Sequence, residues 1–146
     1  MTFQRFPLLL ILLAVACNGP LLVLPGGQLD GETEAAPVNW AFSGDYGTVQ
    51  LESKPQDPYS VNIAFTVVDG RLYINAGDTE TQWVKNMTAD PLVRLRLKGT
   101  IYDLRAARVT SDAEISEFAK AWTSQSMFRR DPTGLEVVWI YELVAR

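Results

Sequence analysis

The stretch GDTETQWVKNMTADPLVRLRLKGTIYDLRAARV, residues 77–109, decides the fold class of this chain. Thr79 and Gln82 have the spacing of a capping box, which predicts the start of a short helix. That helix is expected to end at residues 90–91, because the residue before a proline avoids the α region. Residues 93–98, VRLRLK, then alternate apolar and basic side chains with the period of a half-buried strand. A glycine follows, so the stretch predicts a helix that leads into a β-hairpin.

The rest of the chain supplies four more strands and a second helix. The strands are expected over residues 48–53, 60–68, 71–76 and 135–144. Asp69-Gly70 is a typical two-residue hairpin turn, and Ser111 with Glu114 forms a second capping box. Closing six antiparallel strands into a barrel removes exposed edges. The sequence therefore predicts a mainly β domain over residues 38–146, a six-stranded antiparallel split β-barrel with two short helices.

The central stretch resembles a segment of the flavin- and deazaflavin-dependent nitroreductase-like split barrels, which share the pyridoxamine 5'-phosphate oxidase-like fold. That segment reads roughly W-Y-H-N-L-x-A-N-P-x-V-x-V-x-x-G. The matching residues here are Trp83, Asn86, Met87, Ala89, Asp90, Pro91, Val93 and Gly99. A looser resemblance extends over residues 47–144. The resemblance implies a homodimer that binds FMN or the deazaflavin F420 at the subunit boundary.

The resemblance also implies which residues would hold the cofactor. In the family, a G-R-K-S-G-type loop cradles the phosphate, whereas residues 52–57 here read ESKPQD and keep only the lysine. The residues at the phosphate positions are Lys54, Ser60 and Asn62. The residues on the helix that borders the ring are Trp83, Lys85 and Asn86. A core position is the alternative for Trp83, because it has core spacing with Met87.

Five basic residues on two neighbouring predicted strands form a further candidate site. They are Arg94, Arg96, Lys98, Arg105 and Arg108. Such a row can bind a phosphate-bearing ligand or the acidic groups of a dimer partner. It is also typical of the solvated face of an antiparallel sheet, and the sequence leaves both interpretations open.

The composition excludes several classes of function. The chain has no histidine, which removes histidine zinc sites, Ser-His triads and histidine general bases. Its single cysteine, Cys17, excludes intrachain disulfides and cysteine metal clusters. A net charge of −4 argues against general nucleic-acid binding. The remaining chemistry must use carboxylates, basic residues, tyrosines or a bound cofactor.

The N-terminus is typical of an exported protein. Residues 6–16 form an apolar run that is too short to span a bilayer but suits a signal peptide over residues 1–16. The run ends in LAVAC, which resembles a bacterial lipobox. It predicts a lipoprotein acylated at Cys17, for example with palmitate, on the periplasmic face of the bacterial envelope membrane. An unmodified cysteine that closes an ordinary signal or anchor helix is the alternative.

Residues 17–37 are expected to be the lipidated N-terminus and a tether, because glycine, proline and acidic residues dominate the second half of that segment. Within it, residues 21–24, LLVL, either lie in the membrane interface or dock on the domain.

Two functions remain open for the whole chain. One is a redox module of the nitroreductase or quinone-reductase kind, and the other is a non-catalytic lipoprotein that binds a small ligand or an envelope protein.

Overall fold

The computed structural model describes residues 18–135 and 137–146, so the predicted signal peptide and Cys17 lie outside the described residues. The strands are β1 (Glu32–Glu34), β2 (Tyr46–Ser53), β3 (Tyr59–Val68), β4 (Arg71–Ala76), β5 (Leu92–Leu97), β6 (Thr100–Arg108) and β7 (Trp139–Ala145). The helices are α1 (Gln82–Ala89) and α2 (Asp112–Ser124), and the 3-10 turns are η1 (Ala41–Ser43) and η2 (Pro132–Gly134). Within the described part of the chain, none of the helices has the length and hydropathy needed to cross a bilayer.

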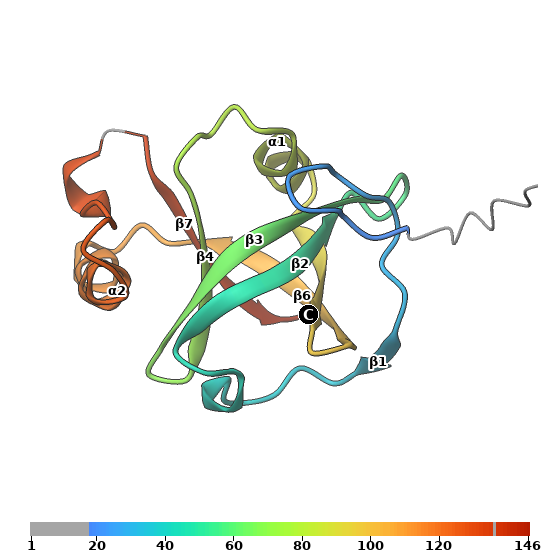
Figure 1. Ribbon diagram of the computed structural model, residues 1–146, viewed down its shortest axis with the longest axis horizontal. Helices are drawn as coiled ribbons and strands as arrows, with labels where there is room; N and C mark the ends of the chain where they lie inside the picture. The colour runs from blue at the N-terminus through green and yellow to red at the C-terminus, as the bar shows by residue number, and fades with distance from the viewer. Residues whose placement is uncertain (1–17, 136) are drawn as a thin grey trace, which may run out of the picture.

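Six strands close into a barrel. Their order is β6-β5-β2-β3-β4-β7, and β7 pairs back onto β6, so every neighbouring pair in the closed ring is antiparallel (Figure 1). The strand β1 adds a short parallel pairing to the first residues of β6. It occupies the edge of β6 that β7 uses further along the strand. The predicted mainly β fold with a six-stranded antiparallel barrel and two helices is confirmed.

The hairpin turns form where the sequence predicts them. Asp69 and Gly70 have φ angles of 49° and 75°, and Lys98 and Gly99 have φ angles of 51° and 88°. Two consecutive left-handed residues match the right-handed twist of the strands that they join. Along β5, alternate residues point into the barrel and are buried, whereas the arginines between them point outward. The period-two interpretation of residues 93–98 is therefore confirmed.

Each end of the barrel is closed by its own segment. At one end Trp40, which is 4% exposed, stacks on Phe42 and meets Tyr102 edge to face, with ring centroids 5.1 Å apart in the second pair. At the other end lies α1, which places the buried side chain of Met87 in the core (Figure 1). Both segments exclude water from the aliphatic interior of the barrel. Burial of this apolar surface is the main source of the stability of the fold.

The start of α1 differs from the prediction. The helix begins at Gln82 with Thr81 at the N-cap and without a side-chain cap. The Asp78 carboxylate instead accepts the Glu80 N–H at 2.8 Å, and the Thr81 hydroxyl donates to the Asp78 carbonyl at 3.2 Å. These local bonds compete with a capping box. The capping box expected from Thr79 and Gln82 is therefore wrong, although the helix itself is present.

The helix α2 packs on the outside of the barrel. Its predicted cap is confirmed, because the Ser111 hydroxyl accepts the Glu114 N–H. Phe118 packs on the ring of Tyr73, with centroids 5.9 Å apart, in a small second core. The last strand begins at Trp139, four residues later than predicted. The Asp131 carboxylate accepts the Thr133 N–H and holds a 3-10 turn first, so the chain pairs with β4 only after that turn.

Residues 18–34, here called the N-terminal strap, lie against the barrel. Gly26 and Ser60 exchange two backbone hydrogen bonds of 2.8 Å. Leu29 is 1% exposed, and β1 extends the sheet beside β6. Residues 18–34 of the predicted tether therefore make contacts with the barrel. The contacts that fix the strap come from strands far away in the sequence, so local composition did not reveal them.

Candidate functional site

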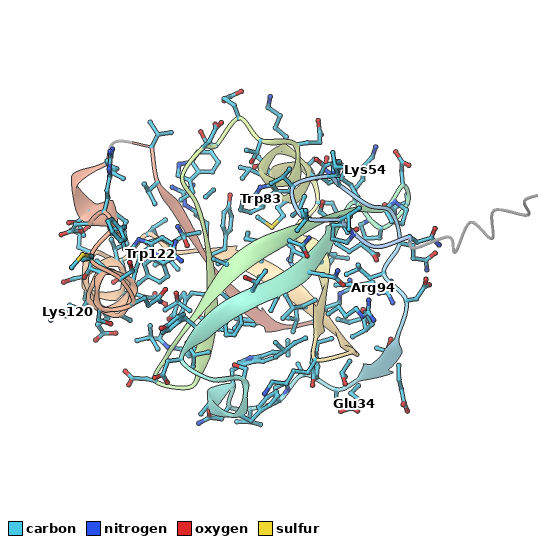
Figure 2. All side chains as sticks on the ribbon, viewed as in Figure 1. Glu34, Lys54, Trp83, Arg94, Lys120 and Trp122 are labelled. Atoms are coloured by element: carbon cyan, nitrogen blue, oxygen red, sulfur yellow. The ribbon has the colours of Figure 1, made fainter. Side chains whose placement is uncertain are left out.

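A groove of about 300 Å³ lies between the β2–β3 loop and α1. It is lined by Lys54, Asp57, Pro58, Tyr59, Gln82 and Asn86. Figure 2 shows Lys54 near the end of the barrel that α1 covers. The structure therefore brings two of the predicted site residues, Lys54 and Asn86, into one groove. It also adds Tyr59 and Gln82, which the motif comparison did not single out.

A chain of side-chain hydrogen bonds fixes the helix side of the groove. Asn86, which is 7% exposed, donates from Nδ2 to the Ser53 hydroxyl at 3.1 Å. Gln82 Nε2 in turn donates to Asn86 Oδ1 at 2.8 Å. The Ser53 hydroxyl donates to the Tyr59 carbonyl at 3.2 Å. Because these bonds join α1 to the barrel, the side-chain amides of Gln82 and Asn86 are held at fixed positions beside the loop.

The loop side carries the one lysine of the groove. Lys54 has a φ angle of 58°, and its carbonyl accepts the Asp57 N–H at 2.9 Å in a tight turn. Its ammonium group pairs with the Asp57 carboxylate at 2.7 Å, and both side chains are largely exposed. The hydrogen bond from Lys54, helped by its charge, lowers the pKa of Asp57. An exposed pair of this kind is weak, so an incoming anion can compete with Asp57 for the ammonium group.

Two of the predicted phosphate ligands are covered by the N-terminal strap. The Ser60 side chain is fully buried, and its hydroxyl makes no hydrogen bond within the described residues. Asn62 donates from Nδ2 to the Leu22 carbonyl at 2.9 Å and to the Pro20 carbonyl at 3.3 Å. In this structure Asn62 therefore serves the strap.

The other two predicted site residues lie outside the groove lining. The Lys85 ammonium group is 3.2 Å from the Glu80 carboxylate, and its side chain is 53% exposed. Trp83 is half-buried and packs against the main core, as the core alternative expects (Figure 2). The six predicted residues are thus divided among the groove (Lys54 and Asn86), the strap contact (Ser60 and Asn62), the core (Trp83) and the helix surface (Lys85).

The basic row on β5 and β6 is largely engaged within the chain. Arg94 pairs with the buried Glu52 at 3.0 Å, and Arg96 donates to the Gln50 side chain at 3.2 Å. Lys98 donates to the Phe42 carbonyl at 3.2 Å. The guanidinium group of Arg108 lies 4.1 Å from the centre of the Trp139 ring. These contacts favour a structural role for the row, and Arg105 is exposed on the same hairpin.

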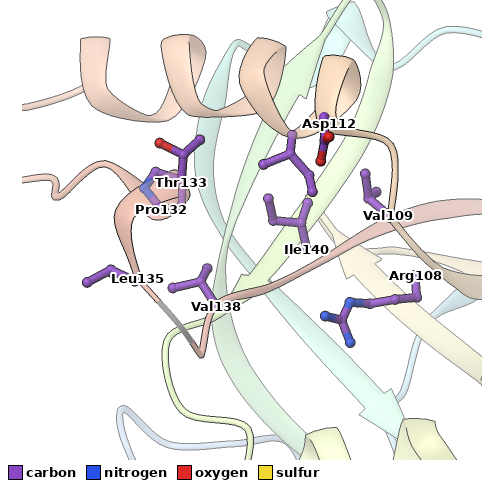
Figure 3. Close-up of a pocket in the computed structure, with 9 residues that line it drawn as sticks. Arg108, Val109, Asp112, Pro132, Thr133, Leu135, Val138 and Ile140 are labelled. Atoms are coloured by element: carbon purple, nitrogen blue, oxygen red, sulfur yellow. The ribbon is translucent and has the colours of Figure 1, made fainter.

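A second cavity of about 360 Å³ lies between α2, η2 and β7 (Figure 3). Its polar groups come from Arg108, Asp112 and Thr133, and its apolar wall includes Val138 and Ile140. Burial lowers the pKa of Arg108 and raises the pKa of the neighbouring Tyr141. The cavity is larger than the groove but is a seam beside the second core. The groove remains the better candidate site, because a hydrogen-bonded amide chain and a lysine converge there.

Solved structures share the barrel at low sequence identity. A FAD-binding protein from Mesorhizobium loti is 16% identical with a TM-score of 0.52, covering 68% of this chain and 78% of its own. A NimC/NimA family protein from Clostridium acetobutylicum is 18% identical with a TM-score of 0.51, covering 70% and 74%. An F420 reductase is 14% identical with a TM-score of 0.51, covering 76% and 96%. At these identities the likeness shows the fold, which is the predicted split barrel.

A comparison with curated proteins finds no match. A family model does match, over residues 56–131, just over half of the chain. The matched segment contains five of the six residues that line the groove, all except Lys54. The family supports the predicted cofactor, F420 or a flavin. The chain belongs to the F420H2-dependent quinone reductase family.

Proposed function

We propose that this protein is a membrane-anchored oxidoreductase that uses F420 or FMN to reduce a quinone-class acceptor. The observation that carries the proposal is the groove of about 300 Å³, whose helix wall and most of whose loop wall fall inside the matched segment. A groove of this size suits the edge of a planar ring or a phosphate group more than a whole dinucleotide. The bound cofactor would supply the hydride chemistry.

The donor set of the groove fits an anionic cofactor. Lys54 would pair with a phosphate or carboxylate of the ligand, because its present partner is an exposed aspartate. The Gln82 amide would orient a polar ring edge, held in place by its bond to Asn86. Ser60 and Asn62 stay outside this set as long as the strap covers them. The chain thus offers fewer phosphate ligands than the resembled motif implies.

The attachment to the membrane and the homodimer belong to the same proposal. The sole cysteine follows a short apolar run, which favours cleavage before Cys17 and acylation there. Mass spectrometry of membrane-extracted protein should then show loss of residues 1–16 and an added lipid mass. Light scattering on the detergent-solubilised protein should give twice the protomer mass. A full-length unmodified N-terminus would contradict the membrane attachment. A monomer mass would contradict the homodimer.

The redox assignment is tested by titration and turnover. The purified full chain is titrated with F420 and with FMN while fluorescence is followed, and reduced F420 is then mixed with a soluble quinone. Saturable binding below about 1 mM, together with quinone-dependent oxidation of F420H2, supports the proposal. If neither cofactor binds in that range, the redox function is contradicted.

A non-catalytic ligand-binding lipoprotein is the second candidate. The specific observation that favours it is the strap, which occupies Asn62 and seals Ser60 at the expected phosphate positions. Under this alternative the barrel keeps its groove but binds no flavin. The same titration separates the two candidates, because only the first one expects a saturable flavin or F420 signal.

A further inference from the structure

Four consecutive apolar residues of the strap form an exposed turn, here called the apolar tip. They are Leu21, Leu22, Val23 and Leu24, with exposed fractions of 68%, 80%, 95% and 61%. Leu21 and Leu24 close the turn with two backbone hydrogen bonds of 3.0 and 2.8 Å. The side chains of these residues are therefore not docked on the domain, although their backbone is hydrogen-bonded to Asn62. Their side chains project away from the barrel.

The residue types in this turn are not those that its backbone conformation favours. Leu22 has a φ angle of 53°, a left-handed conformation that glycine and asparagine adopt most readily. An asparagine at this position would adopt the conformation more readily and would also be better solvated. Four large apolar side chains at one tip instead expose a surface that water solvates poorly. The tip is thus suited to contact an apolar medium.

The barrel holds the tip in a fixed position. Asn62 donates to the carbonyls of Pro20 and Leu22, which lie on the two sides of Leu21. At the base, the Gly27 N–H donates to the Asn18 carbonyl at 2.7 Å, and Gly26 pairs with Ser60. The tip is therefore a loop that is closed by backbone hydrogen bonds and held on β3 by Asn62 and Ser60. A rigid apolar projection can insert into a surface without first being ordered.

We propose that the apolar tip inserts into the lipid interface of the membrane to which the chain is attached. This inference rests on the proposed membrane attachment. Leu22 follows the apolar run that ends at Cys17 by only five residues, so it can lie at most about 18 Å from Cys17. A tip of four residues is far smaller than a stable protein interface of roughly 1,200–2,000 Å². Insertion into lipid needs no such area, because it is enough that the apolar side chains enter the interface to their own length.

Insertion of the tip would also set the orientation of the barrel. Gly27 of the strap lies close to the carbonyl group of Pro58. Pro58 belongs to the loop that lines the groove. The loop at the start of the strap, seen in blue in Figure 1, lies beside the end of the barrel at which α1 lies. The groove would then lie near the bilayer surface. Apolar acceptors dissolved in the bilayer could reach it without crossing water.

Tryptophan quenching tests the insertion in the full chain reconstituted in vesicles with brominated lipids. Val23→Trp places a reporter on the tip, and Val38→Trp is the matched control, because Val38 is fully exposed and lies outside the strap. Wild type, with its four tryptophans, gives the baseline. We expect a blue-shifted emission component that bromine quenches for Val23→Trp, and an unquenched, water-exposed component for Val38→Trp. Equal behaviour of the two variants overturns the proposal.

Flotation of the same vesicles separates this proposal from the attachment on which it rests. Protein that floats with the lipid but shows no quenching at Val23→Trp contradicts the tip and leaves the attachment standing. Protein that does not float contradicts both. Circular dichroism of each variant, compared with wild type, controls for misfolding. Because both reporters replace a valine that is more than nine-tenths exposed, neither should disturb the core.

Discussion

Arg94 Nη1 lies 3.0 and 3.2 Å from the two carboxylate oxygens of Glu52, its direct cross-strand neighbour on β2. Glu52 is 3% exposed and also accepts the Leu29 N–H at 2.6 Å. Arg94 donates to the Leu29 carbonyl at 3.2 Å. The ion pair therefore satisfies both backbone groups of a strap residue. It joins the N-terminal strap to the barrel wall.

Removing Arg94 should strongly destabilise the protein, because it leaves the Glu52 carboxylate buried without a charge partner. Breaking a buried pair typically costs about 3–5 kcal/mol, and the value here should lie at or below the lower end because Arg94 is partly exposed. Urea unfolding of Arg94→Ala measures the loss. Arg96→Ala is the matched control, since Arg96 donates to the neutral Gln50 side chain. Equal losses in the two variants would contradict a special role for the Glu52–Arg94 pair.

A methyl group at Gly26 should loosen the strap. A Cβ atom there would lie 2.4–2.5 Å from backbone atoms of Asn18, Gly19 and Pro20, which cannot move aside easily. At Gly27 the nearest atoms are 3.9 Å away, so Gly27→Ala is the control. Overpacking of this kind costs about 1–3 kcal/mol. Limited proteolysis should cut Gly26→Ala within residues 18–31 faster than wild type and Gly27→Ala. Identical digestion of the three proteins would show that the strap is not closed in solution.

The strands were predictable from the sequence because their signals are local. The alternation in residues 93–98 and the Asp69-Gly70 turn each specify structure within a few residues, and both are confirmed. The groove was predictable in part, because the motif placed Asn86 on a helix and Lys54 on the facing loop. Gln82 and Tyr59 were missed, since neither belongs to the quoted motif.

The strap was not predictable for a physical reason. Its glycines and acidic residues read as a tether, but its stability comes from contacts with residues 60 and 52, more than twenty positions away. Glu52 lies within the predicted strand 48–53, but the sequence did not reveal that its carboxylate is buried and pairs with Arg94. Ser60 and Asn62 were expected to contact a phosphate. Only the folded chain shows that the strap covers them.

Lys54→Ala should weaken cofactor binding if the groove is the cofactor site. Loss of a charge-assisted contact of about 1.5–3 kcal/mol corresponds to a roughly ten- to hundredfold weaker affinity. Lys85→Ala is the matched control, because the exposed fractions of the two side chains are 51% and 53% and Lys85 lies outside the groove. Fluorescence titration with F420 and FMN measures both. A larger effect at Lys85 would move the site to the helix surface.

The contact between Tyr73 and Glu114 should make the fold sensitive to alkali. The Tyr73 hydroxyl donates to the Glu114 carboxylate at 2.6 Å, and the residue is 1% exposed. Burial, with this hydrogen bond, raises the pKa of Tyr73 well above its ordinary value of 10.0. The folded state therefore binds the phenol proton more tightly than the unfolded state. Its stabilising contribution is complete below about pH 10 and is lost as the pH rises further.

Tyr73→Phe should accordingly cost about 0.5–1.5 kcal/mol at pH 7, because Glu114 keeps its pairing with Arg71 at 2.9 Å. It should also reduce the loss of stability that wild type shows as the pH rises above about 10. Part of that loss should remain, since burial raises the pKa of Tyr141 as well. Urea unfolding at several pH values measures both effects, and Tyr46→Phe, at an exposed position, is the control. If Tyr73→Phe and wild type lose stability equally with rising pH, the Tyr73–Glu114 contact does not hold the phenol proton in solution.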